Sequence, residues 1–204
     1  FELSTLGAKR PMILTDAGVR KAGLLAPVEA ALQVGGIGAA AIFDDVPPDS
    51  SLATVRAAAT TYRDNDCDAI LAIGGGSVID TSKAVNNLPR PLKPLFVIPT
   101  TSGTGSEVTL AAVISDPERS VKLPFASYYL MPNATVLDPR MTLTLPAHIT
   151  AMTGMDAMTH AVEAFTCLAA NPISDAYATA AIQKIANNLL VAIDEPRNAD
   201  ARLE

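Results

Sequence analysis

A hydroxyl-rich run, residues 99–109, holds the side chains of this chain best suited to binding a polar ligand. It directly follows an apolar segment, 95–98, that is typical of a buried strand, and most of its residues are glycine, serine or threonine. Small residues with many donors suit close approach to a ligand better than core packing. Two further motifs flank the run, residues 74–80 upstream and 154–160 downstream. Together the three motifs indicate a nucleotide site and half of a metal site.

The upstream motif, Gly-Gly-Gly-Ser at 74–77, follows an expected strand at 69–73 and opens an expected helix. In open α/β sheets, ligands bind outside the carboxyl ends of the strands. Glycines let backbone N–H groups approach a phosphate, and a helix N-terminus adds partial positive charge. Ser77 either donates to the phosphate or caps the helix of an ordinary turn. The pattern is neither a G-x-G-x-x-G fingerprint nor a P-loop, so the turn alone leaves both interpretations open.

The downstream motif places Asp156 and His160 four residues apart on an expected helix, so both project from one face. A carboxylate and an imidazole can bind a divalent metal, but protein sites usually need three or four ligands. A surface salt link is the alternative. His148, the only other histidine, is expected to be structural or near a cofactor. The methionines of this region are expected to pack in the core: Met152, Met155 and Met158.

Two charged residues lie beside these motifs. Asp16 closes the first expected strand, where a carboxylate can accept hydrogen bonds from ribose hydroxyls and repel the 2′-phosphate of NADP. The alternative is a turn-forming aspartate. Lys122 is an isolated basic residue whose default interpretation is a solvated surface position.

Short apolar runs alternate with helix-like segments through the first two thirds of the chain, which predicts a parallel sheet covered on both faces. The runs are 11–16, 40–44, 69–74, 94–100, 111–116 and 135–138, and the helix-like segments are 26–34, 50–63 and 77–87. After Pro146 only helices are expected, at 150–170 and 175–193. The fold class is therefore α/β, with a dinucleotide-binding domain at 1–146 and the beginning of an all-α domain at 147–204.

Composition narrows the function classes. The hydrophobic share of 49% allows a substantial core, and the net charge of −6 without a basic cluster disfavours nucleic acid or an anionic membrane as partner. Cys67 and Cys167 are isolated thiols, which fits a cytoplasmic protein without a disulfide framework. A serine hydrolase is disfavoured because no G-x-S-x-G elbow is present.

The three motifs, in this order, resemble those of the iron-containing (group III) alcohol dehydrogenases. The resemblance extends over nearly the whole chain; residues 99–109 and 154–163 are its specific parts, and 74–80 supports them. It implies an oxidoreductase with a Rossmann-like N-terminal domain, an all-helical C-terminal domain, NAD, and a divalent metal that is Fe2+ or, in some relatives, Zn2+.

By position, the resemblance assigns Asp16 to the adenosine ribose, which favours NAD. It assigns the pyrophosphate loop to Gly75, Gly76, Ser77 and Asp80. Further cofactor contacts are implied for Thr100, Thr101, Thr109 and Lys122, with Met141 and His148 near the nicotinamide. Asp156 and His160 match the first two metal ligands and would act in catalysis through the metal.

The chain departs from the family pattern in three places. The family supplies further histidine ligands from later in the helical domain, whereas no histidine follows His160 here. The link 87–94 is shorter than the resemblance implies. Asp49 stands where relatives often have an asparagine that contacts the cofactor. We therefore expect the chain to be incomplete for catalysis.

The sequence thus predicts an NAD-dependent, metal-assisted alcohol dehydrogenase that transfers a hydride between a small alcohol or aldehyde and nicotinamide. We expect a homo-oligomer, a dimer or larger. One alternative is a metal-free reductase of the maleylacetate reductase type on the same scaffold. The other is a catalytically inactive nucleotide-binding fragment.

Overall fold

The computed structural model describes residues 1–87 and 92–204, which form two compact units. The first unit comprises Phe1–Pro99 and Ser106–Val136, and the second comprises Thr100–Gly105 and Leu137–Glu204. An α/β part followed by helices is confirmed. The sequence-based division at residue 146 lies ten residues beyond this one, and it did not anticipate that the turn Thr100–Gly105 groups with the later helices.

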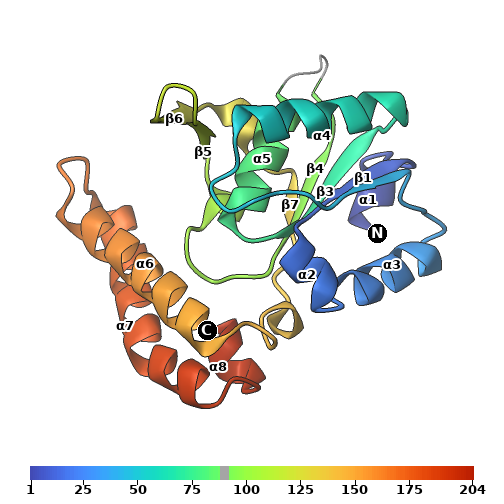
Figure 1. Cartoon of the computed structure of the whole chain (residues 1–204). Coiled ribbons are helices and arrows are strands. Elements are labelled where there is room, and N and C mark those ends of the chain that lie inside the picture. The colour runs from blue at the N-terminus through green and yellow to red at the C-terminus, as the bar shows by residue number, and fades with distance from the viewer. Residues whose placement is uncertain (88–91) are drawn as a thin grey trace. The chain divides into compact units, whose positions relative to one another are not determined.

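The first unit is organised by a five-stranded sheet in the order β2-β1-β3-β4-β7, with every neighbouring pair parallel (Figure 1). The strands are β1 (Pro11–Leu14), β2 (Ala41–Phe43), β3 (Ala69–Gly74), β4 (Leu95–Pro99) and β7 (Ala134–Thr135). Every residue of β1, β3 and β4 is buried. Continuous burial requires cover on both faces of the sheet, so this prediction is confirmed.

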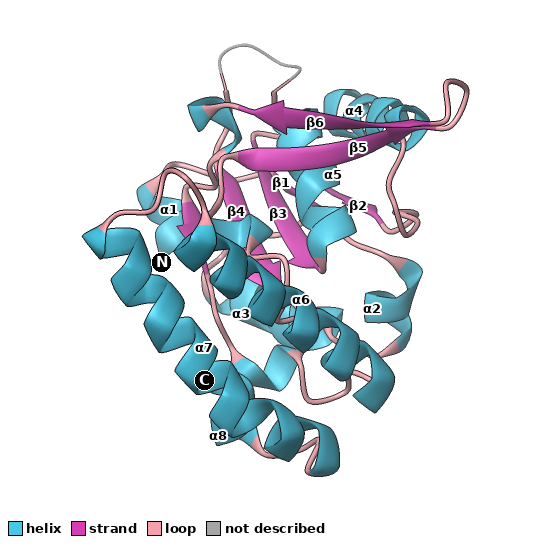
Figure 2. Cartoon of the chain, turned by 90° about the vertical axis from the view of Figure 1, so that its left-hand side faces the viewer, coloured by secondary structure: helices cyan, strands magenta, loops and turns pink. Residues whose placement is uncertain are grey.

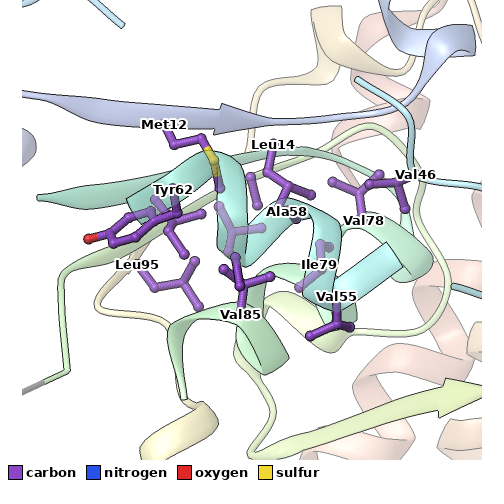
Figure 3. Close-up of a cluster of buried hydrophobic side chains, with 14 of the residues drawn as sticks. Met12, Leu14, Val46, Val55, Ala58, Tyr62, Val78, Ile79, Val85 and Leu95 are labelled. Carbon is purple, nitrogen blue, oxygen red and sulfur yellow. The ribbon is translucent and has the colours of Figure 1, made fainter. Parts of the chain in front are cut away.

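Helices connect the strands and provide that cover. In chain order they are α1 (Glu2–Thr5), α2 (Ala17–Lys21), α3 (Leu25–Val34), α4 (Leu52–Asp64) and α5 (Gly76–Asn86). Figure 1 shows α4 and α5 on one face of the sheet and α3 on the other. Side chains from β1, β3, α4 and α5 form the main hydrophobic cluster, which includes Met12, Tyr62 and Ile79 (Figure 3).

The direction of winding reverses between β1 and β3. The chain moves outward on one side from β1 to β2, then crosses back over β1 to build β3, β4 and β7 on the other side. The Thr15 hydroxyl, which is fully buried, donates to the Ile73 carbonyl at 2.7 Å and joins the two strand ends. Open α/β sheets bind their ligands outside the carboxyl ends of the strands, at a reversal of this kind.

A separate antiparallel hairpin departs from the expected parallel pattern. The expected strand at 111–116 forms as β5 (Ala111–Asp116), but its strand partner is β6 (Val121–Ala126), which the sequence interpretation missed. A single parallel bridge also joins Ser115 to Ser51. β6 is mostly exposed, so its sequence shows neither the continuous apolar run of a buried strand nor the alternation of a half-buried one. It also carries Pro124, which is uncommon within strands. Short 3-10 helices flank this region: η1 (Ser106–Val108), η2 (Tyr128–Leu130) and η3 (Pro139–Met141).

The second unit contains α6 (Ala147–Thr166), α7 (Pro172–Asp194) and α8 (Ala199–Leu203). Figure 2 shows α6 and α7 packed side by side. Helix α7 begins earlier than expected because Asn171 and Ser174 form a capping box. The prediction that the methionines pack in the core was wrong for Met152 and Met155, whose exposed fractions are 66% and 54%.

The shortened link at 87–94 falls largely on residues 88–91, outside the described residues. Among residues 1–87 and 92–204, none of the helices combines the length and hydropathy that crossing a bilayer requires.

Gly74, at the end of β3, is required by close packing of the strand against α5. A Cβ at this position would lie 2.5 Å from Cγ2 and 2.6 Å from Cβ of Val78. Because a branched side chain offers no rotation that moves its Cβ away, we predict that Gly74→Ala lowers the free energy of unfolding by about 2 kcal/mol. Chemical denaturation would measure this. Gly38→Ala, where a Cβ meets nothing within 4 Å, serves as the control and should change stability little.

Candidate functional site

The glycine turn exposes the N-terminus of α5 at the carboxyl edge of the sheet. Gly75 is the N-cap in an extended conformation, and no side chain caps the helix. The interpretation of Ser77 as an ordinary N-cap is therefore wrong. The first backbone N–H groups of an α-helix have no partner within the helix. The turn therefore presents donors and the positive end of the helix dipole, which is the arrangement that binds an anion.

Asp49 and Lys122 lie beside this turn. The Asp49 backbone N–H donates to Ser77 Oγ at 3.2 Å, and the Asp49 carboxylate pairs with Lys122 Nζ at 2.8 Å. Asp49 has φ 53°, a left-handed conformation that asparagine and aspartate tolerate better than most residues. The backbone conformation at position 49 therefore suits both the aspartate of this chain and the asparagine that relatives often have there. Both charged side chains are exposed, so the pair adds little stability, but it neutralises the Asp49 charge near the helix N-terminus.

Asp16 lies on the other side of the reversal point. It follows β1, whose Leu14 is in register with Ala72 of β3, so Asp16 and the glycine turn leave adjacent strands at the same edge. Its Oδ1 accepts the Val19 N–H at 2.9 Å and caps α2. One carboxylate oxygen of Asp16 thus has the turn-forming role that the sequence allowed. The half-buried side chain leaves Oδ2 without a hydrogen bond to the described residues, so a ribose contact stays a prediction.

Asp80 and Lys83 of α5 hold the downstream part of the hydroxyl-rich run. Asp80 accepts from the Ser106 hydroxyl at 2.6 Å and from the Val113 N–H at 2.8 Å. Lys83 donates to the carbonyls of Thr109 and Ala111 and to the Thr109 hydroxyl. Both Asp80 oxygens are thus engaged inside the protein, and its predicted pyrophosphate contact remains untested.

Lys83 is a buried charged residue that the sequence interpretation missed. It is fully buried, and loss of solvation lowers its pKa to about 8, against the opposing attraction of Asp80 and Glu107. One signal was visible in the sequence: on a helix, position 83 shares a face with apolar Ile79. A lysine on such a face must find buried acceptors or lose its charge.

In the second unit, the turn Thr100–Gly105 packs against α6. A Cβ on Gly103 would lie 2.9 Å from Cβ and 3.0 Å from the backbone oxygen of Thr153, so only glycine allows this approach. Thr100 is buried and Thr101 is half-buried. Thr153 lies three residues before Asp156 on the same helix. The structure therefore brings the threonine turn to the helix that carries the predicted metal ligands.

Asp156 and His160 face each other across one turn of α6. Nε2 of His160 lies 3.7 Å from Oδ2 of Asp156, and the two side chains are 57% and 46% exposed. This separation is within salt-bridge range and is also close to that of two ligand atoms bound about 2.1 Å from one divalent ion, so the pair fits the surface salt link as well as half of a metal site. Within the described residues, no group of three histidine, cysteine, aspartate or glutamate side chains gathers to hold a metal.

The two residues assigned to the nicotinamide lie in different surroundings. Met141 is buried in η3, which packs against α8, whereas His148 is exposed in the first turn of α6. No internal contact of either residue indicates a ligand, so both assignments stay predictions.

Comparison with known proteins identifies the family. The sequence model described as "Iron-containing alcohol dehydrogenase" matches residues 1–139, and that described as "Fe-containing alcohol dehydrogenase family, C-terminal" matches residues 150–204. The chain belongs to the iron-containing alcohol dehydrogenase family. The resemblance drawn from the three motifs is thereby confirmed.

Individual relatives agree with this assignment. An NAD-dependent methanol dehydrogenase of Bacillus methanolicus is 36% identical over 98% of this chain and 56% of its own length. The crystal structure of a 1,3-propanediol oxidoreductase superposes with a TM-score of 0.94 at 37% identity, covering 99% of this chain and 57% of that one. Sulfoacetaldehyde reductase from Bifidobacterium kashiwanohense, in complex with NAD+, gives 0.92 at 30% identity, covering 98% and 57%.

The same fold also serves a second class of reductase. Maleylacetate reductase from Agrobacterium tumefaciens superposes with a TM-score of 0.86 at 28% identity, covering 98% of this chain and 55% of that one. In every one of these comparisons, the chain spans a little over half the length of the protein it matches.

Lys83 makes the stability of the protein depend on pH in the alkaline range. Its pKa is about 8 in the folded protein and about 10.4 in an unfolded chain, so between these values only the unfolded state holds the proton. The free energy of unfolding should therefore rise with pH in this window, by about 2 kcal/mol from pH 8 to pH 10.

Urea denaturation at several pH values measures this rise. In Lys83→Met the rise should be absent, because the variant has no proton to release. An identical pH profile in the two proteins would contradict the assignment of the titration to Lys83.

Proposed function

We propose that this chain provides the NAD-binding unit and the first two metal ligands of an alcohol dehydrogenase that acts on a small alcohol or aldehyde. One observation carries the proposal: Asp16 and the uncapped turn at Gly75 leave adjacent parallel strands where the winding of the sheet reverses. A dinucleotide presents a ribose and a pyrophosphate, and this edge presents a carboxylate and a helix N-terminus.

The residues of the first unit fit NAD. The N–H groups at the start of α5 bind the pyrophosphate, and the Asp49–Lys122 pair keeps a net negative charge away from it. Asp16 Oδ2 accepts from a ribose hydroxyl and repels a 2′-phosphate. The names of two relatives mention NAD, which supports the same cofactor.

The residues of the second unit fit part of a metal site. Asp156 and His160 hold a divalent ion, Fe2+ or Zn2+, in the proposed enzyme, and the family description names iron. When bound, the metal supplies a Lewis acid for the substrate oxygen, and the nicotinamide accepts the hydride. The chain itself supplies binding and orientation. The remaining metal ligands must come from outside the described residues.

Two alternatives remain from the sequence. Maleylacetate reductases share the fold, and a metal-free reductase of that type requires no ion between Asp156 and His160. An inactive nucleotide-binding fragment requires no third metal ligand, and none gathers beside Asp156 and His160 among the described residues. Alcohol-dependent formation of NADH, followed by its absorbance, separates the dehydrogenase from the inactive fragment. We retain the cytoplasm as compartment, since both cysteines are free, and a homo-oligomer as the expected assembly.

Asp16 should determine the preference for NAD over NADP. We predict that the chain binds NADH at least about tenfold more tightly than NADPH, and that Asp16→Gly removes most of this difference. Asp16→Asn is the sharper variant, because it keeps an oxygen to cap α2 and removes only the charge. Isothermal titration of each protein with both nucleotides measures the ratio. Asp66→Gly, in the exposed turn before β3 and so at the opposite edge of the sheet, is the control, because Asp66 already has a positive φ that glycine tolerates. Unchanged selectivity in Asp16→Asn would remove the residue from this role.

His160 should bind metal, whereas His148, on the same helix, should not. We predict that His160→Ala weakens Zn2+ binding by at least about tenfold while NADH binding persists. His148→Ala, the only other histidine variant that the chain offers, should keep the Zn2+ affinity of the wild type. Titration of the metal-free proteins measures both. Equal Zn2+ affinities in wild type and His160→Ala would favour the metal-free reductase.

A further inference from the structure

Thr109 lies in a segment that α5 fixes at several points. Asp80 binds Ser106 on one side of Thr109 and Val113 on the other, while Lys83 binds Thr109 itself and Ala111. Strand β5, which begins at Ala111, runs beside α5 (Figure 2). The helix whose N-terminus forms the glycine turn therefore also holds the end of the hydroxyl-rich run.

The contact between Lys83 and the Thr109 hydroxyl has a direction. An ammonium group has three donors and no acceptor, so Thr109 Oγ1 must accept from Lys83 Nζ, 3.3 Å away. The hydroxyl proton of Thr109 can then only be donated. Its acceptor in the structure is the Ser106 carbonyl at 3.4 Å, which is a long hydrogen bond.

Thr109 is half-buried, whereas Lys83 is fully buried and cannot reach a ligand. A half-buried hydroxyl whose proton is directed away from Lys83, and whose present bond is long, can exchange that acceptor for an oxygen of a bound nucleotide at little cost. The charges that face Lys83 are Asp80 on α5 and Glu107 on η1. Neither forms a hydrogen bond with Nζ, so Thr109 is the side chain through which the ammonium acts.

We propose that Lys83 is a positioning residue of the nucleotide site that orients the Thr109 hydroxyl as a hydrogen-bond donor to the bound dinucleotide. This inference rests on the proposed function. Lys83 is too deeply buried to contact a cofactor, so its effect on binding passes through a single hydroxyl.

A double-mutant cycle on NADH binding tests this coupling at pH 7, where Lys83 carries its charge. Lys83→Met removes the donor, and Thr109→Val removes the hydroxyl but keeps the backbone carbonyl. Each should raise the Kd for NADH by about tenfold. If Lys83 acts through Thr109, the double variant should bind no more weakly than either single variant.

Three further measurements separate positioning from general damage. Ser82→Ala removes a fully buried hydroxyl that bonds only to Val78 of its own helix, so it should bind NADH within twofold of the wild type. Lys83→Gln, with two amide donors, should recover part of the affinity lost in Lys83→Met and serves in the cycle if the methionine variant does not fold. Circular dichroism checks the fold of each protein.

The inference would be overturned if the two increases in Kd for NADH multiplied in the double variant. It would also be overturned if Lys83→Met or Thr109→Val bound NADH as tightly as the wild type. If the wild type binds NADH and only this cycle fails, the proposed function stands without Lys83. If the wild type does not bind NADH, the proposed nucleotide site fails, and the role of Lys83 fails with it.

Discussion

The parallel pairing of β1 with β3 is the constraint on which the rest of the first unit depends. Because the chain reverses its winding there, the loops after these two strands are adjacent and lie outside the core. The buried bond from Thr15 to the Ile73 carbonyl fixes the two ends at the same level. Close packing of Gly74 on Val78 then sets where α5 begins. Asp16 and the helix N-terminus are placed by these contacts rather than by any contact with each other.

Helix α5 connects this edge of the sheet to the hydroxyl-rich run. Its first turn offers free N–H groups, and its third turn carries the Lys83 ammonium beneath Thr109. A single rigid element thus supports the glycine turn and the end of the hydroxyl-rich run. Burial of a lysine lowers its pKa and costs stability, and such a cost is commonly tolerated where a charge organises a site. In the second unit, Gly103 gives the threonine turn its close contact with α6 in the same sterically enforced way.

The features carried by local patterns could be predicted from the sequence. Continuous apolar runs identified β1, β3 and β4, and the spacing of Asp156 and His160 gave their shared face. Features that depend on distant partners could not be predicted. The antiparallel pairing of β6, the positive φ of Asp49 and the acceptors of Lys83 arise from contacts between segments far apart in the chain. Met155 misled the interpretation because helical spacing identifies an apolar face but does not say whether a neighbour covers it.

The most direct test of the central claim is the response of backbone amides to NAD+, recorded by NMR on the isotope-labelled chain. The account predicts saturable shifts at Asp16, Gly75, Gly76 and Ser77, since these residues flank the reversal between β1 and β3. Amides on α7, such as that of Lys184, should remain unchanged. Saturable shifts confined to another surface, or no shifts at concentrations that saturate related dehydrogenases, would contradict it.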